Sequence, residues 1–447
     1  MHGDPAHATS IIFGLSPIWV ASTLFVVTYL VIMSDKLNRA IVALLGAGLL
    51  VLVGVLNQHE AMAAVDFNTL GLLLGMMLIV NITRRSGLFQ YVAIWSAKKV
   101  DAKPWGILLM MSTVTAVFSA FLDNVTTVLL TVPVTMVITG ALKVKPYPYL
   151  FAQIFASNIG GTATLIGDPP NIMIGSATGL TFNDFAIGLT PIIIVIFVAT
   201  MIPIYYVWGR HLVATDENRR HVMGLNERDT ITDRRLLKQS LTVIALVIAG
   251  FMLQRQIEIE PATIAIFGAA VLLLLDNLGK DSETQSKNVH ATLSESEWIT
   301  LMFFLGLFIL VFGIQKTGLI DMMAETLLKT TGGDLKLTTL AVLWASAILS
   351  AFIDNIPFVA TMIPLIKAMG PTFGGDSALL PLWWALSLGA CLGGNGTLIG
   401  ASANLVVAGL AERAGTVFRF MEYLKMAFPL MLISIVLSHV YIYFRYL

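Results

Sequence analysis

The sequence contains the phrase SAFLDN at residues 119–124 and the phrase SAFIDN at residues 350–355, each at the end of a long apolar run. An aspartate at membrane depth is costly, because hydrocarbon offers no hydrogen-bond partners to a charged or polar group. The same costly phrase nevertheless occurs twice, at an offset of 350 − 119 = 231 residues. This repetition is the first sign that the chain consists of two related halves.

Two further pairs of phrases follow the same order and nearly the same spacing. RSGL at 85–88 matches KTGL at 316–319 at an offset of 231, and GGTATLIGDPPN at 160–171 matches GGNGTLIGASAN at 393–404 at an offset of 233. We therefore expect an internal duplication, with a first repeat over 1–209, a charged linker over 210–236 and a second repeat over 237–447.

The composition indicates a polytopic membrane protein. Of 447 residues, 57% are hydrophobic and 12% are charged, whereas a soluble domain carries about 25% charged residues. The mean hydropathy is +0.83, and apolar runs such as 10–33 are long enough to span a bilayer. The net charge of zero argues against nucleic acid as a partner, and no histidines pair at metal-ligand spacing.

The positions of lysine and arginine predict the topology. The loop 34–39 carries Lys36 and Arg39, and the segments 84–104 and 209–236 are also basic, so the positive-inside rule places all three in the cytoplasm. The first half then satisfies the rule only if 105–142 enters and returns as a re-entrant hairpin. An odd number of crossings per half makes the second repeat inverted. We expect ten crossings, two hairpins (105–142 and 338–370) and both termini outside.

The hairpin tips carry the first candidate site residues. Asp123, Asn124 and Thr126 lie at one tip, and Asp354 and Asn355 lie at the other. Ionisable residues inside a membrane are functional candidates by default, so we expect these groups to bind a solute, an ion or a proton. The alternative is that the aspartates only cap the returning helices, since Asp is a good N-cap residue.

The second candidate region is a pair of interrupted helices, 147–178 and 378–408. Interrupted apolar segments at corresponding positions of two repeats are typical of transport sites, although a simple packing kink is the alternative. Glycines are expected to break the helices, and the exposed backbone and amides are expected to hold a solute. The candidate ligands are Asn158, Gly160, Gly161, Thr162 and Asn171 in the first repeat, and Gly393, Gly394, Asn395, Thr397 and Asn404 in the second.

Asp168 breaks the symmetry of the two repeats, because Ala401 occupies the matching position. A solute on the pseudo-two-fold axis should be held by shared groups, whereas coupling to protons needs only one titrating acid. We therefore assign proton coupling to Asp168. The alternative is that Asp168 only caps the helix that starts at Pro169.

The phrases FLDNVTTVLLTVPV and NIGGTATLIGDPPN resemble the arsenite-permease/P-protein branch of the ion transporter superfamily, over about residues 15 to 445. The resemblance implies two inverted repeats, each with a hairpin and an unwound helix, in an inner-membrane homodimer that works by elevator-type alternating access. It also implies that the hairpin tips and the segments Gly160–Asn171 and Gly393–Asn404 form the site.

These observations predict a secondary transporter for a small inorganic solute, not an enzyme. The favoured function is arsenite or antimonite efflux coupled to a proton or sodium gradient, with no other cofactor. A sodium/proton antiporter is the first alternative, and an anion or dicarboxylate transporter of the same superfamily is the second. A passive channel and an intramembrane aspartyl protease are further alternatives, the latter opposed by the duplicated helix breaks.

Overall fold

The chain folds into helices, and the fold class is the predicted all-α polytopic membrane protein. The computed structural model describes residues 14–34 and 36–447, and no strand occurs in these ranges. Residues 1–13, with which the predicted first repeat begins, lie outside the described part. Among the described helices, nine are long and apolar enough to cross a membrane, and shorter apolar helices such as Pro17–Met33 and Pro261–Asn277 accompany them.

The described part of the first half contains ten α-helices. They are α1 (Pro17–Met33), α2 (Arg39–Leu52), α3 (Gln58–Ala63), α4 (Phe67–Arg84), α5 (Leu88–Lys99), α6 (Pro104–Phe121), α7 (Asn124–Leu142), α8 (Tyr147–Gly161), α9 (Pro169–Thr178) and α10 (Phe182–Val207). A short 3₁₀ turn at Gly209–His211 and the helix α11 (Asp216–Met223) follow, and a second 3₁₀ turn at Glu227–Thr230 completes the connection.

The second half repeats this order with two small additions, α13 and α20. Its helices are α12 (Arg234–Met252), α13 (Gln254–Ile257), α14 (Pro261–Asn277), α15 (Ser282–Ser294), α16 (Trp298–Lys316), α17 (Leu319–Thr330), α18 (Leu335–Phe352), α19 (Asn355–Ala368), α20 (Gly370–Phe373), α21 (Leu380–Gly393), α22 (Ser402–Arg413) and α23 (Phe420–Tyr446). Two 3₁₀ turns, Asp376–Leu379 and Gly394–Gly396, flank α21.

The matching helices of the two halves run in opposite directions. Arg84 at the end of α4 pairs with Glu295, just before α16, at 2.8 Å, so α4 ends where α16 begins. The matched phrases RSGL and KTGL also adopt the same local structure. Gly87 and Gly318 each have φ of 82° and precede α5 and α17, respectively. The repeat is therefore structural, and it is inverted.

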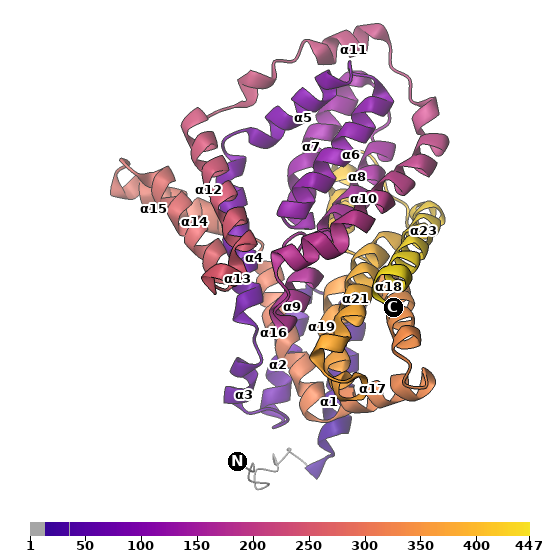
Figure 1. The fold of residues 1–447 in the computed structure, drawn as a ribbon. Helices are drawn as coiled ribbons and strands as arrows, with labels where there is room; N and C mark the ends of the chain where they lie inside the picture. Colours follow the sequence, from indigo (N-terminus) through magenta and orange to yellow (C-terminus); the bar gives the residue numbers. More distant parts are fainter. Residues whose placement is uncertain (1–13, 35) are drawn as a thin grey trace.

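The helices form two kinds of packing unit. In one, α4 packs along α14 and α2 packs along α16; we call these four helices the scaffold. In the other, each hairpin packs on the interrupted helix of its own half, with α6 on α8 and α18 on α21. We call α6–α9 the first hairpin unit, and α18, α19, α21 and α22 the second hairpin unit. The two hairpin units also meet, because α19 contacts α9 and α22 contacts α7 (Figure 1).

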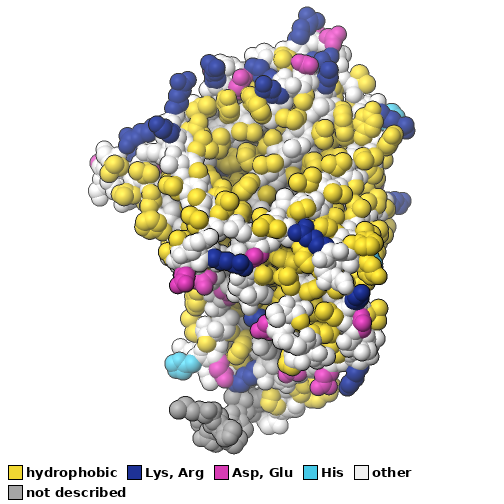
Figure 2. All heavy atoms as spheres, in the orientation of Figure 1, with side chains coloured by type: hydrophobic (Ala, Val, Ile, Leu, Met, Phe, Trp, Pro, Cys, Tyr) yellow, Lys and Arg dark blue, Asp and Glu magenta, His cyan; other side chains and the backbone are white. Residues whose placement is uncertain are grey.

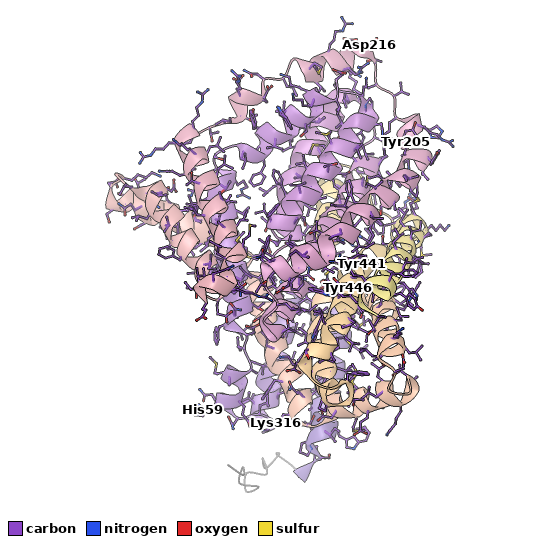
Figure 3. The ribbon with its side chains drawn as sticks, in the orientation of Figure 1. His59, Tyr205, Asp216, Lys316, Tyr441 and Tyr446 are labelled. Atoms are coloured by element: carbon purple, nitrogen blue, oxygen red, sulfur yellow. The ribbon has the colours of Figure 1, made fainter. Side chains whose placement is uncertain are left out.

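Charged contacts lie at both ends of the molecule. At one end, Asp216 of the connecting segment lies far from His59 and Lys316 at the other (Figure 3). Lys98 of α5 pairs with Glu227 of the connection at 2.6 Å, so two of the three segments predicted to be cytoplasmic, 84–104 and 209–236, lie together. Figure 2 shows hydrophobic side chains over most of the middle of one face, with lysines and arginines around its upper rim.

Candidate functional site

At the tip of each hairpin, an aspartate caps the helix that follows it. The Asp123 carboxylate accepts a hydrogen bond from the backbone N–H of Thr126 at 2.8 Å and so caps α7, and the Asp354 carboxylate caps α19 through the N–H of Ile356 at 3.1 Å. Capping of both hairpins is therefore confirmed. Capping uses only part of each carboxylate, so these residues keep oxygen atoms free for other partners.

Hydrogen bonds at matching positions attach each hairpin to its interrupted helix. The Ser119 hydroxyl donates to the carbonyl of Ser157 at 2.6 Å, and its counterpart Ser350 donates to the carbonyl of Ala390 at 2.6 Å. Both interrupted segments repeat this arrangement, because the hydroxyls of Thr164 and Thr397 donate to the carbonyls of Ala120 and Ala351 at the two tips. Each hairpin and its interrupted helix therefore form one connected unit.

The prediction that glycines break the helices is confirmed, because α8 ends at Gly161 and α21 ends at Gly393. Gly160 and Gly161 are the last two residues of α8, and Gly393 is the last residue of α21, so these glycines are helical. Their function is close packing, since a Cβ on Gly160 would lie 2.1 Å from the carbonyl oxygen of Ala116, and one on Gly393 would lie 2.5 Å from that of Ala347. The chain unwinds only after these residues, over 162–168 and 397–401.

Asn171 and Asn404 hold the unwound segments in shape. The Asn171 amide donates to the carbonyls of Thr162 at 3.1 Å and Thr164 at 2.9 Å. The Asn404 amide likewise donates to the carbonyls of Gly394 at 2.7 Å and Thr397 at 2.9 Å. Backbone groups outside helices are tolerated in a membrane only where protein or water forms hydrogen bonds with them. The amides of Asn171 and Asn404 form such bonds with the unwound segments.

Buried amides join the two halves. The amide of Asn124 donates to the Asn158 Oδ1 at 3.1 Å, and Asn158 in turn donates to the Oδ1 atoms of Asn395 at 3.0 Å and Asn404 at 2.9 Å. All four residues are at most 3% exposed. The two repeats therefore meet through a polar network of residues that the sequence had singled out.

Asp168 lies at the centre of the molecule and does not cap its helix. Its side chain makes no capping bond to α9 and is 0% exposed. Its Oδ1 accepts a hydrogen bond from the Asn355 amide at 3.3 Å, whereas its Oδ2 has no partner among the described residues. The Asp168 carboxylate therefore does not cap α9, and its buried Oδ2 can accept a hydrogen bond from a ligand or take up a proton.

The hairpin tips and Asp168 line one small cavity. Its lining includes Asp123, Asn124, Asp168, Asn355 and Ser402 from the two hairpin units, together with Arg39, Glu297 and Thr300 from the scaffold side. Asp354, another predicted residue, lies outside this lining and pairs with Arg39. The other predicted residues are buried and do not line the cavity; they are Thr126, Asn158, Gly160, Gly161, Thr162, Asn171, Gly393, Gly394, Asn395, Thr397 and Asn404. Arg39, which the charge pattern predicts in a cytoplasmic loop, lines this cavity although it is not among the predicted site residues.

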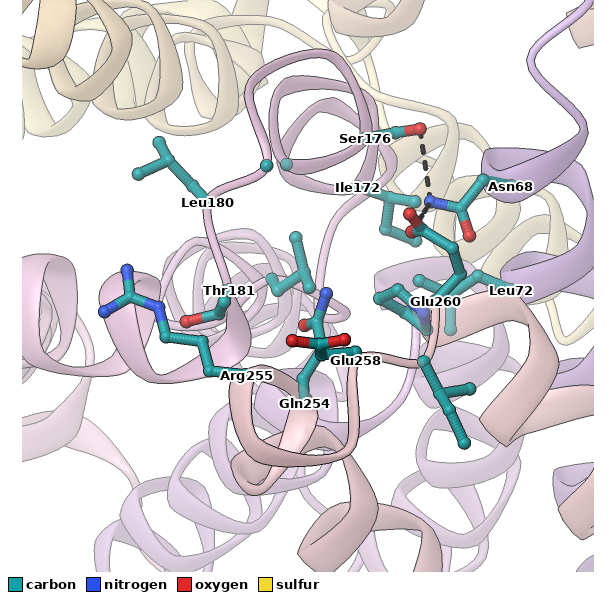
Figure 4. A pocket seen from close by; sticks show the side chains of 15 residues that line it. Asn68, Leu72, Ile172, Ser176, Leu180, Thr181, Gln254, Arg255, Glu258 and Glu260 are labelled. Atoms are coloured by element: carbon teal, nitrogen blue, oxygen red, sulfur yellow. Dashed lines mark hydrogen bonds between the residues drawn. The ribbon is translucent and has the colours of Figure 1, made fainter. Parts of the chain in front are cut away.

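A second, wider cavity of about 310 Å³ lies between the scaffold and the first hairpin unit. Asn68 of α4 donates there to the hydroxyl of Ser176 at 3.3 Å and to the carboxylate of Glu260 at 3.0 Å (Figure 4). Arg255, which also lines this cavity, pairs with Asp184 of α10 at 3.0 Å. Polar contacts therefore connect the scaffold and a hairpin unit on this side too.

Two curated proteins resemble nearly the whole chain. It is 42% identical over 431 residues to the uncharacterized transporter Rv2684 of Mycobacterium tuberculosis, covering 96% of this chain and 98% of that one. It is also 33% identical to the human P protein, covering 95% of this chain but 59% of that one.

The fold also has a solved counterpart. The crystal structure of the Alcanivorax borkumensis YdaH transporter, described as having an unusual topology, matches with a TM-score of 0.59 at 14% identity and covers 97% of this chain and 99% of that chain. A family model described as a citrate transporter matches residues 29–389. The chain therefore belongs to the CitMHS family and is a multi-pass membrane protein of a secondary transporter family.

Proposed function

We propose that this chain moves a small polar solute against its gradient by coupling it to protons. The observation that supports the proposal most directly is the Asp168 carboxylate, which is fully buried between the two hairpin units and has one oxygen without a partner among the described residues. A buried carboxylate that can gain and lose a proton is a suitable coupling group.

The favoured solute is arsenite or its antimony analogue. Arsenite at neutral pH is an uncharged trihydroxide, so its O–H groups can donate to lining oxygens such as those of the Asp123 carboxylate and the Asn124 and Asn355 amides. The lining acids Asp123, Asp168 and Glu297 outnumber Arg39, the one arginine or lysine among the described lining residues. A neutral donor-rich solute needs no cation to balance its charge in such a site.

Two other solutes are supported by specific observations. The clustered carboxylate and amide oxygens would also suit sodium, which would make the chain a sodium/proton antiporter. The description of the matching family model favours citrate. A citrate trianion would meet two aspartates and one glutamate in the lining against a single arginine that is already paired with Asp354, which disfavours citrate on charge alone.

We further propose alternating access of the elevator type. The hairpin units are bonded internally by Ser119, Ser350, Thr164 and Thr397, and this supports movement of each unit as one body against the scaffold. The basic segments 84–104 and 209–236 lie together at one end, which supports the placement of 209–236 on the cytoplasmic side of an inner membrane. We also propose that the transporter is a homodimer.

Purified protein in liposomes tests the transport function. Arsenite, antimonite, citrate and sodium are offered one at a time with an imposed proton gradient, an imposed sodium gradient or neither, and protein-free liposomes are the control. We expect arsenite or antimonite to accumulate only with the proton gradient. Accumulation of citrate or sodium instead would replace the proposed solute, and equal uptake without any gradient would replace the transporter with a channel.

A further inference from the structure

Arg39 occupies a position that ordinary helix chemistry disfavours. It is the first residue of α2, where the helix dipole repels a cation. Its guanidinium is also close to the first residues of α19 and α22, because it contacts Asp354 and Ser402, which lie at those helix starts. A cation near several helix N-termini needs a strong local reason to be there.

The contacts of Arg39 cross from the scaffold to the second hairpin unit. On the scaffold side, its Nη2 donates to the Thr300 hydroxyl at 3.1 Å, and the guanidinium lies 5.2 Å from the centre of the Phe303 ring. On the other side, its Nη1 lies 3.2 Å from the Asp354 Oδ2, and Ser402 donates to the same oxygen at 2.8 Å. The partners are part-buried, with side-chain exposures of 25% for Arg39 and 17% for Asp354.

The first hairpin unit has no such arrangement. Asp123 is the counterpart of Asp354, but no lysine or arginine pairs with it among the described residues, and Pro169 replaces Ser402. The other titratable groups that line the cavity are Asp168 and Glu297, and both are acids. Arg39 therefore neutralises one acid of the cluster selectively.

We propose that Arg39 is a built-in counter-cation that occupies Asp354 in this state and must be exchanged for a coupling cation before the hairpin unit can move. This inference rests on the proposed ion-coupled transport. Movement of the hairpin unit away from the scaffold would separate the pair and leave a part-buried aspartate without a cationic partner, unless a proton or a sodium ion takes the place of the guanidinium. Arg39 thereby links ion loading at Asp354 to the motion.

The variants Arg39→Gln and Arg39→Lys test the exchange. Arg39→Gln removes the competing cation, so we expect the apparent affinity of the transporter for its coupling cation to rise by about tenfold, the usual effect of one close charge pair. Arg39→Lys keeps the charge but loses the guanidinium fork that reaches Thr300 and Asp354 together, so its apparent cation affinity should lie between those of the wild type and Arg39→Gln. The double variant Arg39→Gln with Asp354→Asn should show the same cation dependence as Asp354→Asn alone.

A measurement without any solute keeps this test independent of the transport proposal. The thermal unfolding midpoint of detergent-purified protein is followed against pH and sodium concentration for the wild type and for each variant. We expect the midpoint of Arg39→Gln to respond at roughly tenfold lower proton or sodium concentration than that of the wild type. A folded Arg39→Gln protein with the wild-type cation response in this measurement would overturn the inference, whether or not any solute of the panel is transported.

Discussion

The two hairpin units share their frame and differ in their charged groups. Both attach hairpin to interrupted helix through the same serine and threonine bonds, and both support the unwound segment with an asparagine amide. They differ at the position where the first unit has Asp168 and the second has Ala401. They also differ because Asp354 has an arginine partner that its counterpart Asp123 lacks. The shared residues hold the fold, and the unshared ones are therefore the best candidates for the work of coupling.

The largest expected effect is loss of the folded protein when the shared frame is overpacked. Gly160→Ala places a Cβ 2.1 Å from the backbone oxygen of Ala116, and Gly393→Ala places one 2.5 Å from that of Ala347. Backbone cannot yield as a flexible side chain can, so each change should cost about 3 kcal/mol or more of stability.

Size-exclusion chromatography and thermal unfolding in detergent check this prediction. Gly140→Ala is the matched control, because its Cβ would meet nothing within 4 Å on the helix α7. The control should unfold at or above the wild-type temperature. Stable, monodisperse Gly160→Ala protein would show that the two helices do not pack as closely as described.

The next largest effect concerns Asp123 and Asp354, the two aspartates at the hairpin tips. Asp123→Asn and Asp354→Asn both keep a good capping residue, so both proteins should fold. Each should lower gradient-driven transport by roughly 10- to 100-fold if its charge takes part in coupling. Only Asp354→Asn leaves Arg39 without an anionic partner, so it should also lower the thermal unfolding midpoint more than Asp123→Asn does.

Transport in proteoliposomes and unfolding of the same protein preparations measure both parts of this comparison. Wild-type transport by both variants would reduce the two aspartates to helix caps. Equal unfolding midpoints for the two variants would show that the Arg39 pair contributes nothing to stability.

The smallest expected effect concerns an ion pair at the end of the scaffold. Lys316 and Glu60 lie 2.7 Å apart, with side chains about 30% exposed. Burial opposes ionisation of Glu60, but hydrogen bonds from Lys316 and from the backbone of Asn57 hold the pKa of its carboxyl below the usual 4.5. The stability that this pair adds is therefore present above pH 4.5 and is lost as the pH falls through the lowered pKa.

We expect Glu60→Gln to cost at most about 1 kcal/mol at pH 7 and low salt, because such pairs are screened by water and ions. Unfolding midpoints of the variant and the wild type should converge at high salt and once the pH has fallen through the lowered pKa of Glu60, where the wild-type carboxyl is protonated as well. A difference that persists under both conditions would assign the effect to packing.

Much of the fold could be predicted from the sequence because it repeats its own phrases. The duplication, the hairpins and the interrupted helices follow from SAFLDN, SAFIDN and the two glycine-rich segments. The roles of individual residues were less accessible. Whether a glycine breaks a helix or allows close packing depends on its neighbour, and Ala116 lies 44 residues before Gly160 in the chain.

Arg39 shows the same limit for the site. It lies 315 residues from Asp354, and at the start of an apolar helix it is indistinguishable from a residue that anchors the membrane surface. One signal was present, namely a cation placed at the wrong end of the helix dipole. Asn171 and Asn404 were expected to hold the solute, but their amides are bonded to the unwound backbone, which no spacing rule could indicate.

The most direct test of the central claim is proton-driven accumulation by Asp168→Asn. Asparagine matches aspartate in shape but cannot titrate, so the variant should bind the solute and exchange it downhill at near wild-type rates while it no longer accumulates solute when a proton gradient is imposed. Ala401→Asn, at the matching position of the second unit, is the control and should keep proton-driven accumulation. Loss of solute binding together with coupling would place Asp168 in the solute site, and wild-type accumulation by Asp168→Asn would contradict its assignment as the coupling acid.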